Sequence, residues 1–573
     1  MPFQSRWTID IPNCHLATLL FTSPTHPLSQ TRPCFLDAAR PDTHYFTEHA
    51  FRLWSQRFAA GLRRAGLQRG DRVLLFSGND LFFPVVFMGI IMAGGIFTGA
   101  NPTFVARELE YQLRDSEATF LICAMGSLAT GVQAARGAGL GLDRVFVFDN
   151  AVFEQYGADQ GTDRIHKKHE EGLRGCRYWG ELIASAEEGS RFVWEDLMTP
   201  GAADTRTLAL NYSSGTTGRP KGVEITHKNY VANLLQYNFL FYLYPDWVER
   251  VARARWLCFL PMYHAMAQNI FIAAALRRGV PVYIMPKFDM LTMLEYTEKF
   301  RITDYIIVPP VVVALAKHPA VRSGQYDLSS VEGVFSGAAP LGAEVCEQVE
   351  KLWAPGQIKV RQGWGMTETT CSLLGWDPRM QPHPASVGEL NANCEAKIMA
   401  DDDKTELGPN QRGELWVRGQ NIMKGYWKNP GATKEAKTED GWLKTGDIAF
   451  VNDQGLFHVV DRKKELIKVK GNQVAPAELE AILLDHPAVA DAAVIGVPLN
   501  DDERPRAYIV LNSGQTATKK DILSFMDGKV SPFKRITGGV VFIDAIPKNP
   551  SGKILRKMLR ERANAEIQPT ARL

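Results

Sequence analysis

Short apolar runs rich in β-branched residues alternate with amphipathic stretches along the first three quarters of the chain. The runs at 144–148, 280–285 and 304–308 have the length and composition of buried strands. Between them lie segments with helical spacing, such as 291–300, which places Leu and Tyr on one face. Strands that alternate with helices in this way form parallel sheets covered on both faces. The expected fold class is therefore α/β.

The pattern changes after about residue 400. The segments 400–404 and 407–412 are polar and typical of turns. The runs at 413–418 and 455–460 alternate in polarity, which predicts a small antiparallel or barrel-like section.

A smaller α+β unit is predicted after Asp461. Its expected elements are helices at 477–484 and 519–529 and strands at 492–497 and 507–511. The chain is therefore expected to contain a large N-terminal domain of layered, mostly parallel sheets with helices and the barrel-like section (1–461), a hinge (462–464) and a small mobile α+β C-terminal domain (465–573).

Composition excludes several classes of protein. With 573 residues, 45% of them hydrophobic, the chain has enough apolar side chains for a sizeable core. A net charge of +2 argues against a dedicated nucleic-acid binder, although residues 462–573 carry +6 and the rest −4. The eight cysteines form no C-x-x-C pair, which predicts neither a zinc site nor a disulfide framework and fits a reducing compartment.

One apolar segment, 81–100, is long enough to span a membrane. Pro84 and Gly89 interrupt it, and it follows a predicted buried strand at 71–76. A core helix followed by a strand explains the segment better, so no membrane span is expected. No secretory signal is expected at the N-terminus either.

The loop at 212–222 is rich in glycine, hydroxyl groups and positive charge. Gly215 and Gly218 free the backbone to present N–H groups, the hydroxyls add donors and Lys221 adds a cation. The spacing differs from a Walker A loop. A plain Ser/Thr/Gly linker is the alternative, but the apolar strand at 208–210 before the loop favours a polyphosphate-binding role.

Five further motifs occur in a fixed order: 336–340 (SGAAP), 362–368 (QGWGMTE), 444–447 (KTGD), 461–476 (DRKKELIKVKGNQVAP) and 547–556 (PKNPSGKILR). Together with the loop at 212–222, they resemble the adenylate-forming superfamily of acyl-CoA synthetases, adenylation domains and firefly-type luciferases. The resemblance runs from about residue 46 to 557, and the 4-coumarate–CoA ligase-like branch is the most similar.

The resemblance implies a nucleotide site. Trp364, in place of the more usual Tyr, would stack on adenine and lose the hydroxyl, while Asp447 would accept hydrogen bonds from the ribose and Arg462 would support it. Glu368 would help to hold Mg²⁺, since a carboxylate beside phosphates suits a hard cation. The expected ATP- and AMP-binding residues are Ser213, Ser214, Gly215, Thr216, Thr217, Gly218, Lys221, Ala338, Gln362, Gly363, Trp364, Thr367, Asp447, Arg462, Lys464, Lys468, Gln473 and Lys553.

The resemblance also assigns the catalytic and CoA-binding residues. Lys553 would stabilise the transition state in which a carboxylate attacks the α-phosphate of ATP, because a cation between two anions offsets their repulsion. The expected catalytic residues are Lys553, Thr217, Glu368 and His264, and those expected to bind CoA are Lys287, Lys470 and Gly471. Lys464 would occupy the hinge. A solvated charged face is the alternative for the 461–476 segment.

The segment at 261–270 resembles the one that opens the acyl pocket. His264 would gate the carboxylate or thiol path, although a buried structural histidine is the alternative. Met266 and Ile270 stand where hydroxycinnamate ligases place polar groups for the phenol, so the acid is expected to be apolar rather than 4-coumarate: aryl-alkanoic, cinnamic-type or a medium-chain fatty acid. The expected pocket residues are His264, Met266, Ile270, Phe335, Ala338, Gly363 and Gly365.

The sequence therefore predicts an ATP-dependent ligase that forms an acyl-adenylate and pyrophosphate and then transfers the acyl group to CoA. An adenylation enzyme that feeds a carrier protein and a luciferase-like monooxygenase are the alternatives; no fused carrier is expected, because 20 residues follow Lys553. A non-catalytic sensor would be expected to lack Lys553 or Glu368. After a polar tail, Ala571-Arg572-Leu573 resembles a peroxisomal signal, which predicts a peroxisomal import receptor as partner and otherwise a cytoplasmic location.

Overall fold

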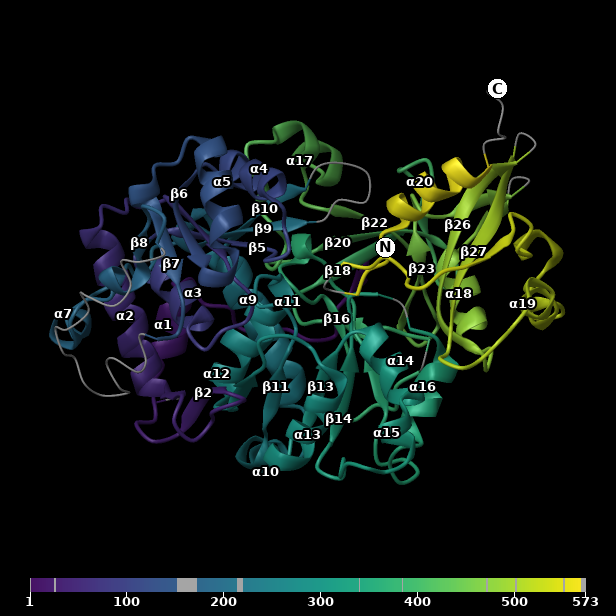
Figure 1. Cartoon of the computed structure of the whole chain (residues 1–573), viewed down its shortest axis with the longest axis horizontal. Helices are drawn as coiled ribbons and strands as arrows, with labels where there is room; N and C mark the ends of the chain where they lie inside the picture. Colours follow the sequence, from purple (N-terminus) through teal and green to yellow (C-terminus); the bar gives the residue numbers. More distant parts are fainter. Residues whose placement is uncertain are drawn as a thin grey trace.

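The computed structural model describes residues 2–24, 27–151, 173–213, 220–339, 341–383, 385–469, 472–499, 502–549 and 552–567. The polypeptide forms a large body that contains three sheets, and its C-terminal elements pack at one end of that body (Figure 1). The α/β class and the large and small sheet-containing parts agree with the predicted fold class.

An eight-stranded sheet occupies one half of the large body. Residues Val73 and Leu75 of its central strand contribute to one hydrophobic cluster, and Leu74 and Phe76 contribute to another, so both faces are covered. All its pairings are parallel except those of β10. The strands, in spatial order, are β21 (Gly425–Tyr426), β10 (Lys221–Thr226), β9 (Thr207–Ser213), β5 (Ile96–Ala100), β4 (Arg72–Phe76), β6 (Ala118–Ala124), β7 (Val145–Phe148) and β8 (Arg177–Tyr178).

A seven-stranded sheet forms the other half and is parallel except for β3. Neighbouring strands keep a regular register, with Asp304 opposite Gly333 and Ser336 opposite Gln362. The strands, in spatial order, are β15 (Val360–Gln362), β14 (Gly333–Ser336), β13 (Asp304–Ile307), β11 (Trp256–Cys258), β12 (Val282–Ile284), β2 (Pro33–Asp37) and β3 (Tyr45–Thr47).

Helices cover both sheets, as the alternation of segments predicts. Gly89 lets two of them approach closely, because a Cβ there would lie 2.9 Å from the Ser55 carbonyl oxygen. The helices are α1 (Leu16–Phe21), α2 (Glu48–Arg64), α3 (Phe83–Met92), α4 (Ala106–Ser116), α5 (Leu128–Ala138), α7 (Ala186–Ser190), α8 (Ala202–Thr205), α9 (His227–Phe241), α10 (Trp247–Arg253), α11 (Ala265–Ala267), α12 (Ala275–Arg278), α13 (Met290–Phe300), α14 (Pro309–Lys317), α15 (Pro319–Arg322), α16 (Ala343–Glu350) and α17 (Pro430–Ala436).

The apolar segment at 81–100 folds as a core helix and a strand. Every residue of α3 is buried, and β5 pairs with β4 in the middle of the eight-stranded sheet. Within the part of the chain that the structure describes, no helix has the length and apolar character needed to cross a membrane.

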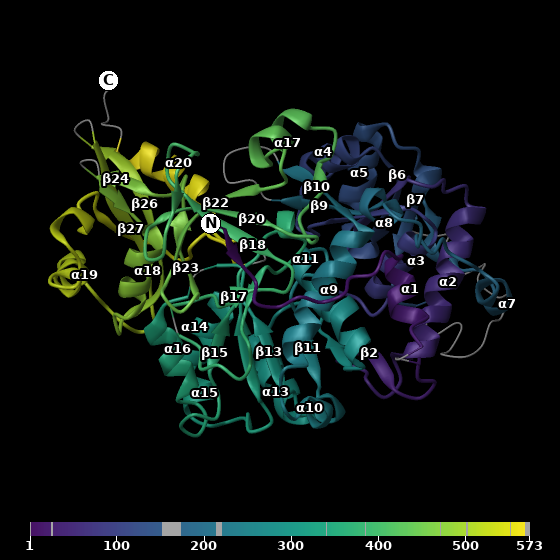
Figure 2. The ribbon, with the colours of Figure 1, turned by 180° about the vertical axis from the view of Figure 1, so that it is seen from behind.

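The barrel-like section is an antiparallel sheet. Its first strand comes from the N-terminus, which Figure 2 shows beside β18. The strands are β1 (Phe3–Gln4), β18 (Glu395–Met399), β20 (Gly413–Arg418), β22 (Leu443–Val451) and β23 (Phe457–Arg462), with β19 (Glu406–Leu407) paired to β18. Two further two-stranded pairs are β16 (Leu374–Gly375) with β17 (Glu389–Leu390) and β24 (Ile467–Val469) with β25 (Asn472–Val474).

The C-terminal part has a core of its own around a three-stranded sheet. The expected polar tail (563–570) is helical as far as residue 567, and Ala563 is buried in one cluster with Tyr508, so this stretch is not the frayed end that was expected. The elements are α18 (Pro476–Leu484), β26 (Val489–Leu499), β27 (Asp502–Leu511), α19 (Lys519–Met526), β28 (Val540–Phe542) and α20 (Arg556–Ile567).

Polar contacts tie this part to the large body. Lys317, at the end of α14, donates from Nζ to the carbonyl oxygens of Leu484 (2.9 Å) and Val489 (2.6 Å). Nearby, the carboxyl group of Asp485 is hydrogen-bonded to Glu344 of α16. Burial first, and the Glu344 carboxyl next, raise the pKa of Asp485 from 3.8 to about 7.

We expect this contact to weaken as pH rises. A raised pKa means that the docked arrangement holds the Asp485 proton more tightly than the separated surfaces do, so its contribution is full below pH about 4 and is lost as pH rises through about 7. Tryptic cleavage at Lys463 and Lys464 should therefore speed up between pH 6 and 8, relative to Asp485→Asn at the same pH. An equal pH dependence in both proteins would contradict this expectation.

Candidate active site

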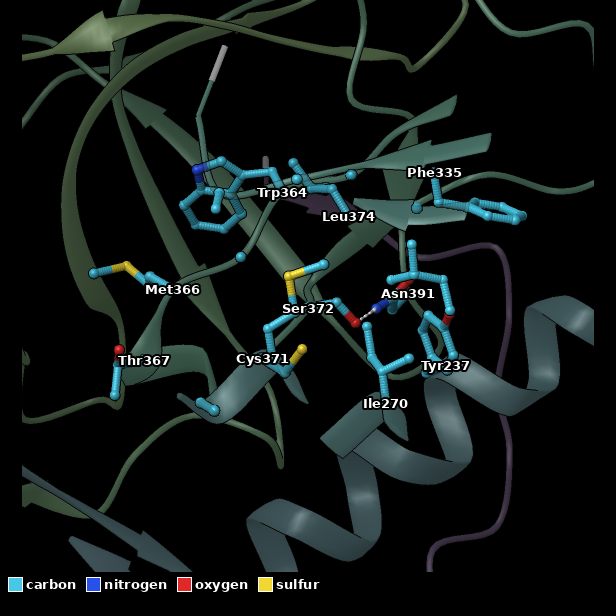
Figure 3. Close-up of a pocket in the computed structure, with 18 of the residues that line it drawn as sticks. Tyr237, Ile270, Phe335, Trp364, Met366, Thr367, Cys371, Ser372, Leu374 and Asn391 are labelled. Atoms are coloured by element: carbon cyan, nitrogen blue, oxygen red, sulfur yellow. Dashed lines mark hydrogen bonds between the residues drawn. The ribbon is translucent and has the colours of Figure 1, made fainter. Parts of the chain in front are cut away.

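A cavity of about 710 Å³ lies between the large body and the C-terminal part. Figure 3 shows part of its wall, with side chains from both the sheet and α9 pointing into it. Of the predicted site residues, it is lined by Ser213, Lys221, His264, Met266, Ile270, Phe335, Ala338, Gln362, Gly363, Trp364, Gly365, Thr367, Glu368, Arg462, Lys464 and Lys553.

The geometry of the parallel sheet explains why two of the motifs meet. The loops that begin at Gly337 and Gly363 leave the carboxyl ends of β14 and β15, which are neighbours, and Gly363 N–H donates to the Ser336 carbonyl oxygen (2.9 Å). Carboxyl ends of adjacent parallel strands form a binding edge in α/β proteins. Ala338 has a φ of +77°, a conformation that brings the backbone of this loop close to the cavity.

Trp364 contacts the carboxylate that was predicted to bind the ribose. Its indole Nε1 donates to Asp447 Oδ2 at 2.8 Å, and Arg462 Nε lies 3.4 Å from Asp447 Oδ1. Asp447 is buried, and among the described residues its Oδ1 has no hydrogen-bond partner. The Trp364 indole therefore does more than supply a ring, because it orients the Asp447 carboxylate, which does not itself line the cavity in this arrangement.

The phosphate side of the cavity is built around Glu368. This buried carboxylate accepts a hydrogen bond from the Tyr426 hydroxyl at 3.0 Å, and Lys221 Nζ lies 4.8 Å from the centre of the Tyr426 ring. Ser213 and Lys221 are paired across β9 and β10, so the two strands hold both ends of the glycine-rich loop at the cavity. Ser214, Gly215, Thr216, Thr217 and Gly218 lie outside the described residues.

Lys553 enters the cavity from the C-terminal part. Its backbone N–H donates to Asn549 Oδ1 (2.9 Å), and the preceding Gly552 has a φ of +81°. A Cβ on Gly552 would lie 2.9 Å from Pro310 Cγ of the large body, so only glycine fits this close approach. Burial, followed by the charge of Arg462, lowers the pKa of Lys553 to about 8, against the opposing effects of Asp447 and Glu368.

His264 faces the same cavity as an uncharged ring. Burial first, and the charge of Lys553 next, lower its pKa to about 4. Its Nε2 is buried and has no hydrogen-bond partner among the described residues. At neutral pH, His264 is therefore uncharged and adds no second cation beside Lys553. Its ring can line the cavity and can take part in a hydrogen bond.

The acyl side is apolar where the sequence predicted it. Met266, Ile270 and Phe335 line it, with Ile270 on a π-helical segment (Gln268–Ala274) of a kind that often occurs at functional sites. Sequence reasoning missed a further wall on α9 and just beyond it. Tyr237, Leu240, Phe241 and Tyr244 line the cavity at helical spacing, which is the signal that could have identified them.

Several predicted residues lie elsewhere in this arrangement. Lys468 and Gln473 are exposed and do not line the cavity; Gln473 lines a separate cavity of about 250 Å³. In this arrangement, Lys553 is the residue that the last part of the C-terminal segment places at the cavity, together with Asn549. Lys287 is exposed between β12 and α13 and does not line the cavity. Lys470 and Gly471 lie outside the described residues.

Comparisons with known proteins match both parts of the chain. The family model "AMP-binding enzyme" matches residues 29–427, and the model "AMP-binding enzyme C-terminal domain" matches 478–553. A 4-coumarate–CoA ligase of Petroselinum crispum is 38% identical over 543 residues, which cover 93% of this chain and 91% of the relative. A phenylacetyl-CoA ligase of Aspergillus niger is 34% identical over 575 residues, covering 99% of this chain and 100% of the relative.

Solved structures share the whole fold. ATP-bound MatB from Rhodopseudomonas palustris is 25% identical with a TM-score of 0.77, covering 97% of this chain and 99% of that chain. An anthranilate–CoA ligase in complex with anthranoyl-AMP is 22% identical with a TM-score of 0.78, covering 97% of this chain and 98% of that chain, and supports the fold alone.

Replacing Trp364 with Phe tests the role of its indole N–H as a hydrogen-bond donor to Asp447. The ring remains for stacking, but the buried Asp447 carboxylate loses a donor, a change that costs about 1–3 kcal/mol. We expect KM for ATP to rise by roughly tenfold or more, while KM for the acid changes little. Steady-state kinetics with each substrate varied in turn measure both constants. An unchanged KM for ATP would show that the indole donor does not contribute to nucleotide binding.

Proposed function

The chain belongs to the family of AMP-binding enzymes, and from this premise we propose that it is an ATP-dependent acyl-CoA ligase that activates aryl acids. The placement of Lys553 carries the proposal most directly. The side chain is buried in a cavity whose walls also include Glu368, on the phosphate side, and His264, on the acyl side. A single cation is therefore close to both of the anions that the first reaction must bring together.

In the first step, a carboxylate oxygen of the acid attacks the α-phosphorus of ATP. The new P–O bond forms as the bond to pyrophosphate breaks, which gives acyl-AMP and pyrophosphate. Lys553 stabilises the negative charge that accumulates on the oxygens around phosphorus. With a pKa of about 8, Lys553 is mostly protonated at neutral pH, as this role requires.

In the second step, the CoA sulfur attacks the acyl carbon, and AMP leaves with the electrons of the acyl–phosphate bond as the thiol proton is released. Lys468 and Gln473 lie away from the cavity in this arrangement, and the C-terminal part occupies it with Lys553 instead. We assign thioester formation to a second arrangement, in which the face that carries 468–473 turns toward the acyl-adenylate.

Glu368 suits a role in Mg²⁺ binding. One of its oxygens accepts from Tyr426, and the other accepts no hydrogen bond from a described residue. Mg²⁺ commonly uses one or two protein carboxylates together with substrate phosphates. When bound, the ion would neutralise charge on the phosphate oxygens. Among the described residues, no cluster of three or more ligating side chains occurs, which fits an ion that arrives with ATP.

The similarity to CoA ligases supports CoA as the acceptor over a carrier protein, and ligation over luciferase-like oxygenation. The relatives reported above are named for 4-coumarate and phenylacetate, both aryl acids. The apolar side chains of Met266, Ile270, Phe335 and Leu374 in the cavity favour a ring or alkyl chain next to the carboxylate. Medium-chain fatty acids, which fit the same apolar wall, belong in the substrate panel as the second class of acid.

Lys553→Ala tests the division between the two steps. We expect acid-dependent ATP–pyrophosphate exchange to fall by roughly 10²–10³ or more, because one preorganised cation is lost from the transition state. CoA thioester formation from supplied acyl-adenylate should be retained. Lys557→Ala, an exposed lysine on α20, serves as the matched control. Equal loss of both activities in Lys553→Ala would refute the assignment, and absence of CoA-dependent AMP release from the wild type would refute ligase function itself.

We also propose a peroxisomal location. Ala571-Arg572-Leu573, which lies outside the described residues, has the small–basic–Leu form of a receptor-read signal. A fluorescent protein fused ahead of residue 1 should collect in peroxisomes when 571–573 form a free carboxyl end. It should be spread through the cytoplasm when these three residues are deleted. Peroxisomal accumulation without them would contradict the proposal.

A further inference from the structure

The cavity changes character along its length. Its apolar wall near the reacting carboxylate gives way to charged side chains at the opposite end. Asp304 and Glu332 mark the amino ends of β13 and β14, whereas the nucleotide loops leave the carboxyl ends of the same sheet. Three residue steps along the strand lead from Asp304 to Ile307, which is about 10 Å. The cavity therefore runs along the strands, from the nucleotide edge toward the amino edge.

The cavity-lining residues of α9, and Tyr244 just beyond its end, indicate the same length of cavity as the strands do. The seven residue steps from Tyr237 to Tyr244 correspond to about 10 Å along a helix axis. Tyr244, at the deep end, is half-buried, and the charges of Arg361, Arg250, Asp304 and Arg278 all act on its phenol group. These charged residues therefore gather around the deep end of the acyl cavity rather than at the nucleotide.

Arg278 is the most unusual member of this group. It lines the cavity, is 8% exposed and lies against the rings of Tyr237, Phe241 and Trp256, at 4.8, 4.3 and 5.3 Å from their centres. Its Nε donates to Asn238 Oδ1 at 2.7 Å. Among the described residues, no carboxylate oxygen lies within 4.0 Å of its guanidinium. Neutral groups therefore hold Arg278 in place without neutralising its charge.

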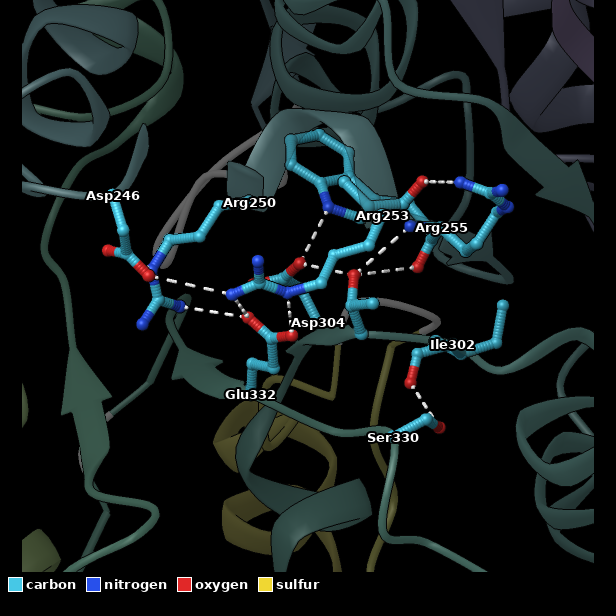
Figure 4. A network of polar contacts seen from close by, with 11 residues as sticks. Asp246, Arg250, Arg253, Arg255, Ile302, Asp304, Ser330 and Glu332 are labelled. Atoms are coloured by element: carbon cyan, nitrogen blue, oxygen red, sulfur yellow. Dashed lines mark hydrogen bonds and ion pairs between the residues drawn. The ribbon is translucent and has the colours of Figure 1, made fainter. Parts of the chain in front are cut away.

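The other charged residues described at this end of the cavity do not form an ion pair with Arg278. Figure 4 shows that Glu332 is engaged by Arg250 and Arg253, which also pair with Asp246, so these four charges cancel. Asp304 is held by the Trp256 indole (3.0 Å) and the Thr303 hydroxyl (2.7 Å).

Arg361 adds a further positive charge to the deep end of the cavity. It lines the cavity, and its Nε is buried without a partner among the described residues. Arg278 and Arg361 therefore add two positive charges to the lining, where Asp304 is the carboxylate whose charge acts on Arg278. The deep end carries an excess of donors and positive charge, which suits an oxygen acceptor and disfavours an ammonium group.

We propose that the deep end of the cavity binds an oxygen-bearing group on the acid, at the end remote from the activated carboxylate, and that Arg278 donates the hydrogen bond. The substrate class is then an acid with an apolar middle and a terminal hydroxyl, keto or carboxylate oxygen. This inference rests on the proposed ligase function, because the acid must enter the cavity with its carboxylate toward Lys553. The Nε of Arg278 donates to Asn238 and one Nη donates to the Tyr237 carbonyl oxygen (3.3 Å), whereas its Nη1 donates to no described residue. An acid that ends in a methyl group would leave this Nη1 without an acceptor and would be disfavoured.

The test uses aryl-alkanoic acids matched in length that differ only in the para substituent of the ring: methyl, hydroxymethyl or carboxylate. The readout is the ratio of kcat/KM between each oxygen-bearing acid and the methyl acid, measured by CoA-dependent AMP release with the full-length enzyme. We expect a ratio of at least about tenfold for the wild type. The hydroxymethyl and carboxylate arms show whether an uncharged or an anionic oxygen is preferred.

Arg278→Met keeps the length of the side chain and removes the guanidinium. We expect the ratio to fall to near one, whereas Arg301→Met, an ion-paired arginine outside the cavity, should keep the wild-type ratio. A uniform loss of activity would leave the ratio unchanged and so cannot imitate the expected result. If Arg278→Met does not fold, Arg361→Met takes its place, and its ratio should also fall.

A wild-type enzyme that uses the methyl acid as well as or better than both oxygen-bearing acids would overturn the inference, and so would a ratio that survives removal of Arg278. Either result leaves the ligase function standing, because the methyl acid still reacts. Failure of every acid to release AMP with CoA would instead refute the proposed function.

Discussion

The burial of one lysine between two separately folded parts is the constraint on which the rest of the structure depends. A carboxylate and a triphosphate repel each other, and a cation placed between them in a site shielded from water acts more strongly than in solution. Burial also disfavours the charged form of this lysine, since it lowers the pKa of Lys553 to about 8. Asp447 and Glu368 partly offset this effect, so the groups proposed to bind the nucleotide and its metal ion also help to keep the lysine charged.

The proposed change in the position of Lys553 between the two reactions depends on its lying on the C-terminal part. The contacts between that part and the large body include the close approach of Gly552 to Pro310, the hydrogen bonds of Lys317, and the Asp485–Glu344 pair. None of these is an extensive apolar interface of the kind that would fix the two parts permanently. The uneven charge, +6 in 462–573 against −4 elsewhere, favours their approach around anionic substrates.

The alternation of apolar runs predicted the α/β class, the buried strands and the core placement of 81–100, because these features depend on local periodicity. The short strand β28 and the polar helix α20 carry little periodic signal and were missed.

The motifs predicted the residues that line the side of the cavity expected to bind the nucleotide. The Trp364–Asp447 hydrogen bond joins positions 83 residues apart, and no local pattern indicates it. Arg278 could not be predicted either, since its site is assembled from α9, α12 and the amino ends of strands. Lys468 and Gln473 depend on how the C-terminal part is turned, which the sequence does not specify.

A reversible cross-link tests the central claim that this arrangement serves the first reaction and not the second. A Cβ on Gly342 would lie 3.2 Å from the Cβ of Ala481 on α18, near the range of about 3.5–4.5 Å found in disulfides. In a Gly342→Cys/Ala481→Cys protein, oxidation should preserve acid-dependent ATP–pyrophosphate exchange and abolish thioester formation, and reduction should restore it. Thioester formation that continues at the wild-type rate in the cross-linked protein, or loss of both activities on oxidation, would contradict the account.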